Sequence, residues 1–194
     1  SGTAVSYAVT VSDVANDSSG QNAAANNALT LANITTVVAS LGADLTSLAI
    51  GDGITWIPQN SFRDTQLTSV TLGSSVDTIA AGAFQNAPLT SLTLGRSVTP
   101  QGIDPAAFTG TRLDESGSSV TIERTVTSDA TLVTEIEDFS PMLPSGTAVS
   151  YAVTVSDVAN DSVGQNAAGN NALTLANITA LVDALGADLT SLVI

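Results

Sequence analysis

A short period of apolar residues limits most strongly what this chain can fold into. Residues 45–66, 67–88 and 89–112 align as three copies of one short segment, the third with a small insertion. One such segment cannot bury its own apolar side chains, so each copy has to cover the open end of the next. The period therefore predicts a short solenoid of about three turns. Its core positions are Leu45, Leu67 and Leu89; Leu48, Val70 and Leu92; Ile50, Leu72 and Leu94; Ile54, Val76 and Val98; and Phe62, Phe84 and Phe108.

The middle copy carries the most specific signal. Its text "LTSVTLGSSVDTIAAGAF" resembles the BspA-type (Treponema-type) leucine-rich repeat, with a strand, an "SV-x-x-I" segment and an "AF" close. The resemblance covers residues 45–111. It implies a leucine-rich-repeat fold and a surface-exposed, adhesive role of the kind found in tandem-repeat bacterial surface proteins.

A second, longer repeat contains the first. Residues 1–50 recur at 145–194, with 43 of the 50 positions identical. We therefore interpret the chain as a window on a tandem array of 144-residue units. The neighbouring units of the same chain are then its first partners, and the array is expected to continue beyond Ile194.

The periodicity divides the chain into four parts. Residues 1–29 are interpreted as a β segment that completes a preceding unit, and 30–112 as a helix-capped leucine-rich-repeat solenoid. Residues 113–173 are expected to form an antiparallel β module, and 174–194 to begin the next solenoid. The predicted cap is an amphipathic helix within residues 26–42, ended by Gly42 and closing the front of the first turn. Its apolar positions are Leu31, Ile34, Val38 and Leu41.

Alternating apolar residues predict the strands of the β module. They occur around Tyr7, at 118–126 and at 130–139, separated by turn-forming stretches. Because residues 113–144 run into 145–160 without a break, these strands are expected to form one small antiparallel sheet between solenoids. The fold class is therefore mainly β, with one short helix per unit.

Charge and composition exclude several function classes. The chain has 18 acidic residues against four arginines and no lysine, a net charge of −14, which disfavours nucleic acid and anionic membranes as partners. No apolar stretch is long enough to insert into a bilayer. Histidine and cysteine are absent, so the commonest general base and thiol chemistry are missing. Because a serine nucleophile also lacks a base, we expect no enzymatic activity and no cofactor apart from Ca²⁺ as an alternative.

The acidic residues offer the one candidate metal chemistry. Glu135 and Glu137 lie two apart on a predicted strand and therefore face the same way. Asp13 and Asp17 lie in a turn-like stretch that does not have the ligand spacing of an EF-hand loop. A solvated strand face and an Asx-stabilised turn are the favoured interpretations. Ca²⁺ binding by these four residues is the alternative.

Candidate binding residues lie on the outward face of the predicted strands. Ser47, Ser69 and Ser91 should form one column, and Ala49, Thr71 and Thr93 a second. A hydrated sheet face is the default interpretation, and ordering of water or ice is an alternative. Trp56 takes the aligned position of Thr78, and either packs against a neighbouring module, which is favoured, or anchors a partner.

We arrive at three hypotheses of function. The first is a structural and adhesive repeat of a giant extracellular bacterial protein, located at the cell surface and forming a stalk or filament for attachment. The second is a recognition module that binds a host or prey surface protein through the sheet face. In the third, units of several chains associate laterally into a fibre through an open strand edge.

Overall fold

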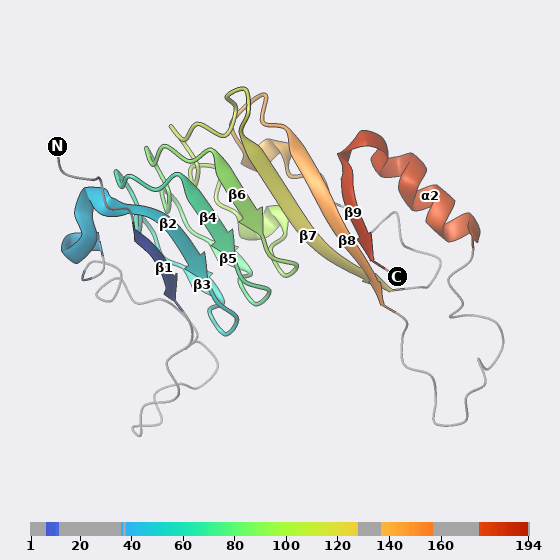
Figure 1. Ribbon diagram of the computed structural model, residues 1–194, viewed down its shortest axis with the longest axis horizontal. Coiled ribbons are helices and arrows are strands. Elements are labelled where there is room, and N and C mark those ends of the chain that lie inside the picture. The colour runs from blue at the N-terminus through green and yellow to red at the C-terminus, as the bar shows by residue number, and fades with distance from the viewer. Residues whose placement is uncertain (1–6, 12–35, 37, 128–136, 157–174, 194) are drawn as a thin grey trace, which may run out of the picture.

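The fold is built on one large parallel β-sheet. The computed structural model describes residues 7–11, 36, 38–127, 137–156 and 175–193. Seven strands follow the order β1-β2-β4-β6-β7-β8-β9, and each neighbouring pair is parallel (Figure 1). Their bounds are β1 Tyr7–Val11, β2 Leu45–Ile50, β4 Ser69–Leu72, β6 Ser91–Leu94, β7 Ser119–Thr127, β8 Val149–Ser156 and β9 Leu189–Val193.

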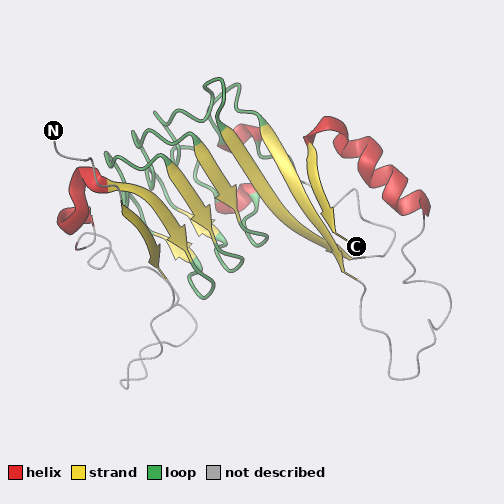
Figure 2. Ribbon diagram, viewed as in Figure 1, coloured by secondary structure: helices red, strands yellow, loops and turns green. Residues whose placement is uncertain are grey.

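A smaller sheet and short helices accompany the large sheet (Figure 2). Strands β3 (Trp56–Ile57) and β5 (Thr78–Ile79) pair in parallel, and Ile79 bridges to Ile103 in the next turn. The longest helix of the described residues is α2 (Leu175–Leu185). Of the helices in those ranges, none combines the length and apolar composition needed to cross a bilayer. The 3-10 helices are η1 Gly42–Asp44, η2 Pro100–Gly102, η3 Ser140–Met142 and η5 Gly186–Asp188.

The apolar columns predicted from the short period are confirmed. Strands β2, β4 and β6 pair in the register of the sequence alignment, and all the predicted core positions are buried in one cluster. The ring centroids of Phe62 and Phe84 lie 5.3 Å apart, and those of Phe84 and Phe108 lie 5.6 Å apart. The rings are stacked, with interplanar angles of 10° and 2°. Successive turns therefore share one interior.

Glycine sets how closely the turns approach each other after each strand. A Cβ atom on Gly95 would lie 2.2 Å from the carbonyl oxygen of Gly73, and a Cβ atom on Gly73 would lie 2.7 Å from the carbonyl carbon of Gly51. No side chain fits at these distances, so the column of glycines keeps the backbones of successive turns in contact.

The predicted antiparallel module is wrong in its pairing direction. Strand β7 pairs in parallel with β6 on one side and with β8 on the other, so residues beyond 112 extend the same sheet. The physical reason is the connection between β7 and β8, which buries Phe139 and Leu143 in the common core instead of forming a hairpin. The predicted strands around Tyr7 and at 118–126 are confirmed as β1 and β7. Most of the predicted strand 130–139 lies outside the described residues, and residues 137–139 are not strand.

The helix predicted within 26–42 lies largely outside the described residues, but its copy in the second unit is helical, and it does not close the end of the sheet. In the second copy α2 ends at Leu185, immediately before Gly186, whose φ is +52°. Leu181 and Leu185 are buried in the core. Strand β1 nevertheless pairs with β2, and β8 pairs with β9, so the helix lies within the connection between two adjacent parallel strands. The helix is therefore a crossover element and not a terminal cap.

Candidate binding surface

The outward face of the large sheet carries rows of hydroxyl groups. Ser47, Ser69, Ser91 and Ser119 lie in register across β2, β4, β6 and β7. The residue that follows each serine on its strand is buried, so the serines face out; these buried residues are Leu48, Val70, Leu92 and Val120. Adjacent strands in a sheet are separated by about 4.8 Å. The serine and threonine columns expected from the sequence thus lie side by side on this face. Ser119 is a fourth member of the serine column.

A second row runs parallel to the serines. Ala49, Thr71, Thr93 and Thr121 lie in register, and Ser150 of β8 continues the row. The hydroxyl oxygens of Thr121 and Ser150 lie 3.4 Å apart, and the Ser150 hydroxyl donates to the carbonyl of Val120 at 3.0 Å. The row therefore extends over five strands, and its four members from β4 to β8 carry hydroxyl groups.

Ser119, Thr121 and Ser150 were not among the residues predicted from the sequence. The signal for the first two was present, because residues 119–122 read "SVTI" and residues 69–72 read "SVTL". The longer spacing between Leu113 and Ser119 concealed the match. In the earlier turns only one residue separates Leu89 from Ser91.

The chemistry of this face is that of neutral hydrogen bonding. Glu123, which is exposed on β7, lies two residues beyond the threonine row. A hydroxyl both donates and accepts, and a single such bond contributes about 1 kcal/mol. The face therefore suits many weak contacts with a flat polar partner.

Trp56 lies on β3 and not on the large sheet. It pairs with Thr78 as the alignment predicted, and its side chain is 42% exposed. The adjacent Ile57 is fully buried. Much of the indole surface is thus exposed, and packing of Trp56 against a neighbouring module stays a prediction.

The candidate calcium ligands are largely outside the described residues. Asp13, Asp17 and Glu135 belong to undescribed stretches, whereas Glu137 is half-buried beside the connection that follows β7. Within the described ranges, no three acidic side chains come together in a group that could hold a metal ion. Calcium binding by these residues therefore stays a prediction.

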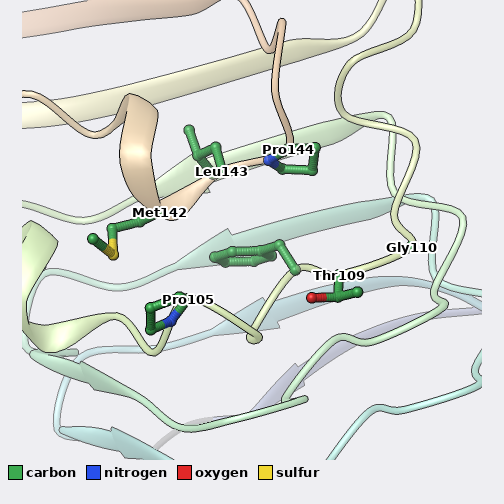
Figure 3. Close-up of a pocket in the computed structure, with 7 residues that line it drawn as sticks. Pro105, Thr109, Gly110, Met142, Leu143 and Pro144 are labelled. Carbon is green, nitrogen blue, oxygen red and sulfur yellow. The ribbon is translucent and has the colours of Figure 1, made fainter.

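An apolar cleft lies at the end of the phenylalanine column. It has a volume of about 230 Å³ (Figure 3). None of its lining side chains ionises, and the ring of Phe108, the last of the stacked column, forms part of its wall. It is lined by Pro105, Phe108, Thr109, Gly110, Met142, Leu143 and Pro144.

Hydrogen bonds along the turns shift the pKa of one surface carboxyl. The hydroxyl and backbone N–H of Ser74 both donate to the carboxylate of Asp52, which belongs to the preceding turn. These bonds, mainly the hydroxyl one, hold the pKa of Asp52 below its ordinary value. The pair ties one turn to the next at the surface and has no catalytic partner among the described residues.

Comparison with known families and proteins gives one match. The family model described as the BspA type leucine rich repeat region matches residues 25–132 in six copies, more than half of the chain. Neither the curated proteins nor the solved structures include a match to this chain.

Proposed function

Because the chain belongs to the BspA-type leucine-rich repeat family, we propose that it is a structural and adhesive tandem repeat of a giant extracellular bacterial protein. Repeats of this family commonly act in surface adhesion or protein binding, and their proteins are typically surface-exposed or secreted. The family is a non-enzymatic repeat and recognition module. In our proposal the 144-residue units form one continuing solenoid that acts as a stalk.

One observation carries this proposal. The pairing of β1 with β2 recurs in the next unit as the pairing of β8 with β9, since Tyr7 opposes Leu45 and Tyr151 opposes Leu189. Both pairings contain a register shift immediately after the tyrosine. Repeated text is thus accompanied by repeated structure on the same sheet, which is what a stalk of many units requires.

The proposed mechanism is reach combined with multivalency. Each unit presents a face of weak hydrogen-bonding groups, and many units on one chain raise the total avidity without a strong single site. The net charge of −14 keeps such a long chain soluble and opposes its self-association. Calcium binding and lateral assembly into a multi-chain fibre remain optional additions to this scheme.

A recognition module is the second candidate function. The open serine and threonine rows of β4 and β6 would then bind a host or prey surface protein. The exposure of Trp56 favours a specific contact, because tryptophan is enriched at binding hot spots. That side chain belongs to the smaller sheet, so a specific partner would contact β3 as well as, or instead of, the large sheet.

Retention of coated beads under flow tests the adhesive function. Beads carrying the chain at increasing density are passed over cultured epithelial cells, a surface rich in proteins and glycans. Multivalent adhesion predicts that retention rises steeply with density and that the free chain binds weakly. The variant S69E/T71E/S91E/T93E should lose retention, whereas W56A should keep it. Tight binding by the free chain that W56A abolishes would favour recognition, and no retention at any density would refute adhesion to this surface.

A further inference from the structure

The boundary between two units lies between β7 and β8. Strand β7 belongs to residues 1–144 and β8 to the repeated text that follows. The strands are in register across this boundary from Val120 opposite Val149 to Thr127 opposite Ser156. Strands within the stack, such as β2 and β4, are in register only from Ser47 to Ile50. The boundary is therefore joined by the longest pairing among the described strands of the sheet.

Arg124 fastens β7 to the preceding turn of the same unit. It points inward, is only 6% exposed, and donates to the carbonyl oxygens of Val98 at 2.6 Å and Arg96 at 3.3 Å. It also donates to the carbonyl oxygen of its neighbour Glu123 at 2.7 Å. Its guanidinium carbon lies 4.7 Å from the centre of the Phe139 ring, a cation–π distance. The earlier strands end at a glycine, whereas β7 continues beyond the equivalent position. Arg124 lies on this longer part of β7 and donates to carbonyl groups of the last regular turn.

The β8 side contributes its own contacts. The hydroxyl of Tyr151 donates to the carbonyl oxygen of Glu137 at 3.1 Å. Val153, which is buried, lies in register with Arg124. Tyr7 on β1 is the copy of Tyr151, so the same strand recurs at the start of each unit. The boundary therefore uses side chains from the end of one unit and the beginning of the next.

On this basis, and resting on the proposed tandem array, we propose that the outer edge of β1 is a docking surface for the β7 strand of a preceding copy of the same unit. In that pairing Ile122 of the preceding unit would oppose Tyr7, as Ile122 opposes Tyr151 in this chain. Consecutive units then share one uninterrupted parallel sheet, and no flexible linker separates them.

The sheet order gives the advance of the array across the strands. From β2 to its copy β9 the order β2-β4-β6-β7-β8-β9 contains five steps. At about 4.8 Å per step, one unit advances the sheet by about 24 Å.

The units are also offset along the strands. Ser191, the copy of Ser47, opposes Ala152, which opposes Glu123. Thr121 lies in the same row as Ala49, and Glu123 is two residues beyond Thr121 on β7. Ala49 is in turn two residues beyond Ser47 on β2. The offset is thus four positions, or about 13 Å at ~3.3 Å per residue. Because four is even, the same side chains point inward in both units. The advance of about 24 Å across the strands and the offset of about 13 Å along them together place equivalent residues about 27 Å apart.

A distance measurement across the boundary tests the proposal in this chain. Ala49 and Val193 are equivalent outward positions of the two units, and no cysteine is present to compete for labels. Spin labels on A49C/V193C, measured by double electron–electron resonance, should give one narrow distribution at about 27 Å, broadened only by the label linkers. A broad distribution, or one centred far above this distance, would overturn the proposal.

Two controls make the result specific to the boundary. The pair A49C/S119C lies within one unit, three strands apart, and should show the strong dipolar broadening of a separation of about 16 Å. Adding V153D, which buries a carboxylate at the boundary, should broaden only the long distance. If both pairs give broad distributions, the stack itself is refuted. If V153D leaves the long distance narrow, the docking contacts assigned to β8 are wrong.

The array geometry has its own readout. Chains with one, two or three copies of residues 1–144 ahead of residues 145–194 should lengthen by about 27 Å per copy in small-angle X-ray scattering. A growth in length typical of flexibly joined beads would overturn the continuous sheet. It would leave the adhesive function standing, because flexibly linked units also give avidity.

Discussion

Phe84 is the side chain whose loss should damage the stack most. It is fully buried and contacts the ring of Phe62 on one side and that of Phe108 on the other. Replacing a buried phenylalanine by alanine costs about 3–5 kcal/mol, and each aromatic pair contributes about 1 kcal/mol beyond its buried area. F84A loses two ring pairs and F62A only one. We therefore expect about 5 kcal/mol for F84A and about 4 kcal/mol for F62A.

Urea unfolding provides the assay. Trp56 is the single tryptophan, so its fluorescence reports on the turn that precedes Phe84, and circular dichroism reports on the sheet as a whole. Total stabilities of domains are about 5–15 kcal/mol, so F84A should be partly unfolded without denaturant if the parent is near the lower end. The conservative variant F84L keeps the measurement possible in that case. A loss below about 1 kcal/mol for F84A, or a larger loss for F62A, would refute the shared ring column.

Three further predictions concern the turns and the boundary. G95A should destabilise the chain by about 3 kcal/mol in urea unfolding, because its Cβ atom would clash with the Gly73 carbonyl. The control G117A, whose Cβ atom would meet open space, should cost about 1 kcal/mol. Equal losses for the two variants would contradict the close approach of the turns. R124M should cost about 3 kcal/mol, because buried carbonyl groups lose a charged donor. A neutral or stabilising effect would show that the guanidinium bonds do not hold β7 to the preceding turn. S74A should raise the pKa of Asp52 toward its ordinary value in an NMR titration, since it removes the hydroxyl donor. Because its pKa is lowered in the folded state, ionised Asp52 stabilises the fold above a pH of about 4, and this stabilisation is lost as the pH falls through the folded pKa. S74A should therefore reduce the loss of stability between neutral and acidic pH.

The short period was sufficient to predict the core of the stack. Residues such as Leu48, Val70 and Leu92 recur at one spacing, and only stacking of neighbouring turns buries them. The same reasoning placed Ser69 and Thr71 on the outward face, because side chains alternate along a strand.

Strand direction beyond residue 112 could not be read in the same way. Alternation of apolar and polar residues in β7 and β8 is compatible with either direction of pairing. The direction was decided by the crossover between them, in which Phe139 joins the common core and Arg124 contacts its ring. That contact joins residues that are well separated along the chain, and it has no local sequence signal.

The role of the helix was missed for a related reason. Its apolar spacing predicted a buried face, and Val38, Leu41 and Leu185, the copy of Leu41, do pack against the core. In the second copy, however, Val182, the copy of Val38, is exposed, and Leu181, which was not among the predicted positions, is buried. An amphipathic helix at the end of a stack and one inside a crossover bury the same face, so the pattern alone does not distinguish them. The pairing of β1 with β2 decided the matter.

Ring-to-ring contacts between phenylalanines test the central claim most directly. The chain has four phenylalanines, so selective labelling of their rings yields a simple NMR spectrum. Stacked turns predict nuclear Overhauser effects between Phe62 and Phe84 and between Phe84 and Phe108, with none between Phe62 and Phe108, whose rings are separated by Phe84. Rings that show no contact with one another would contradict the shared interior of the successive turns.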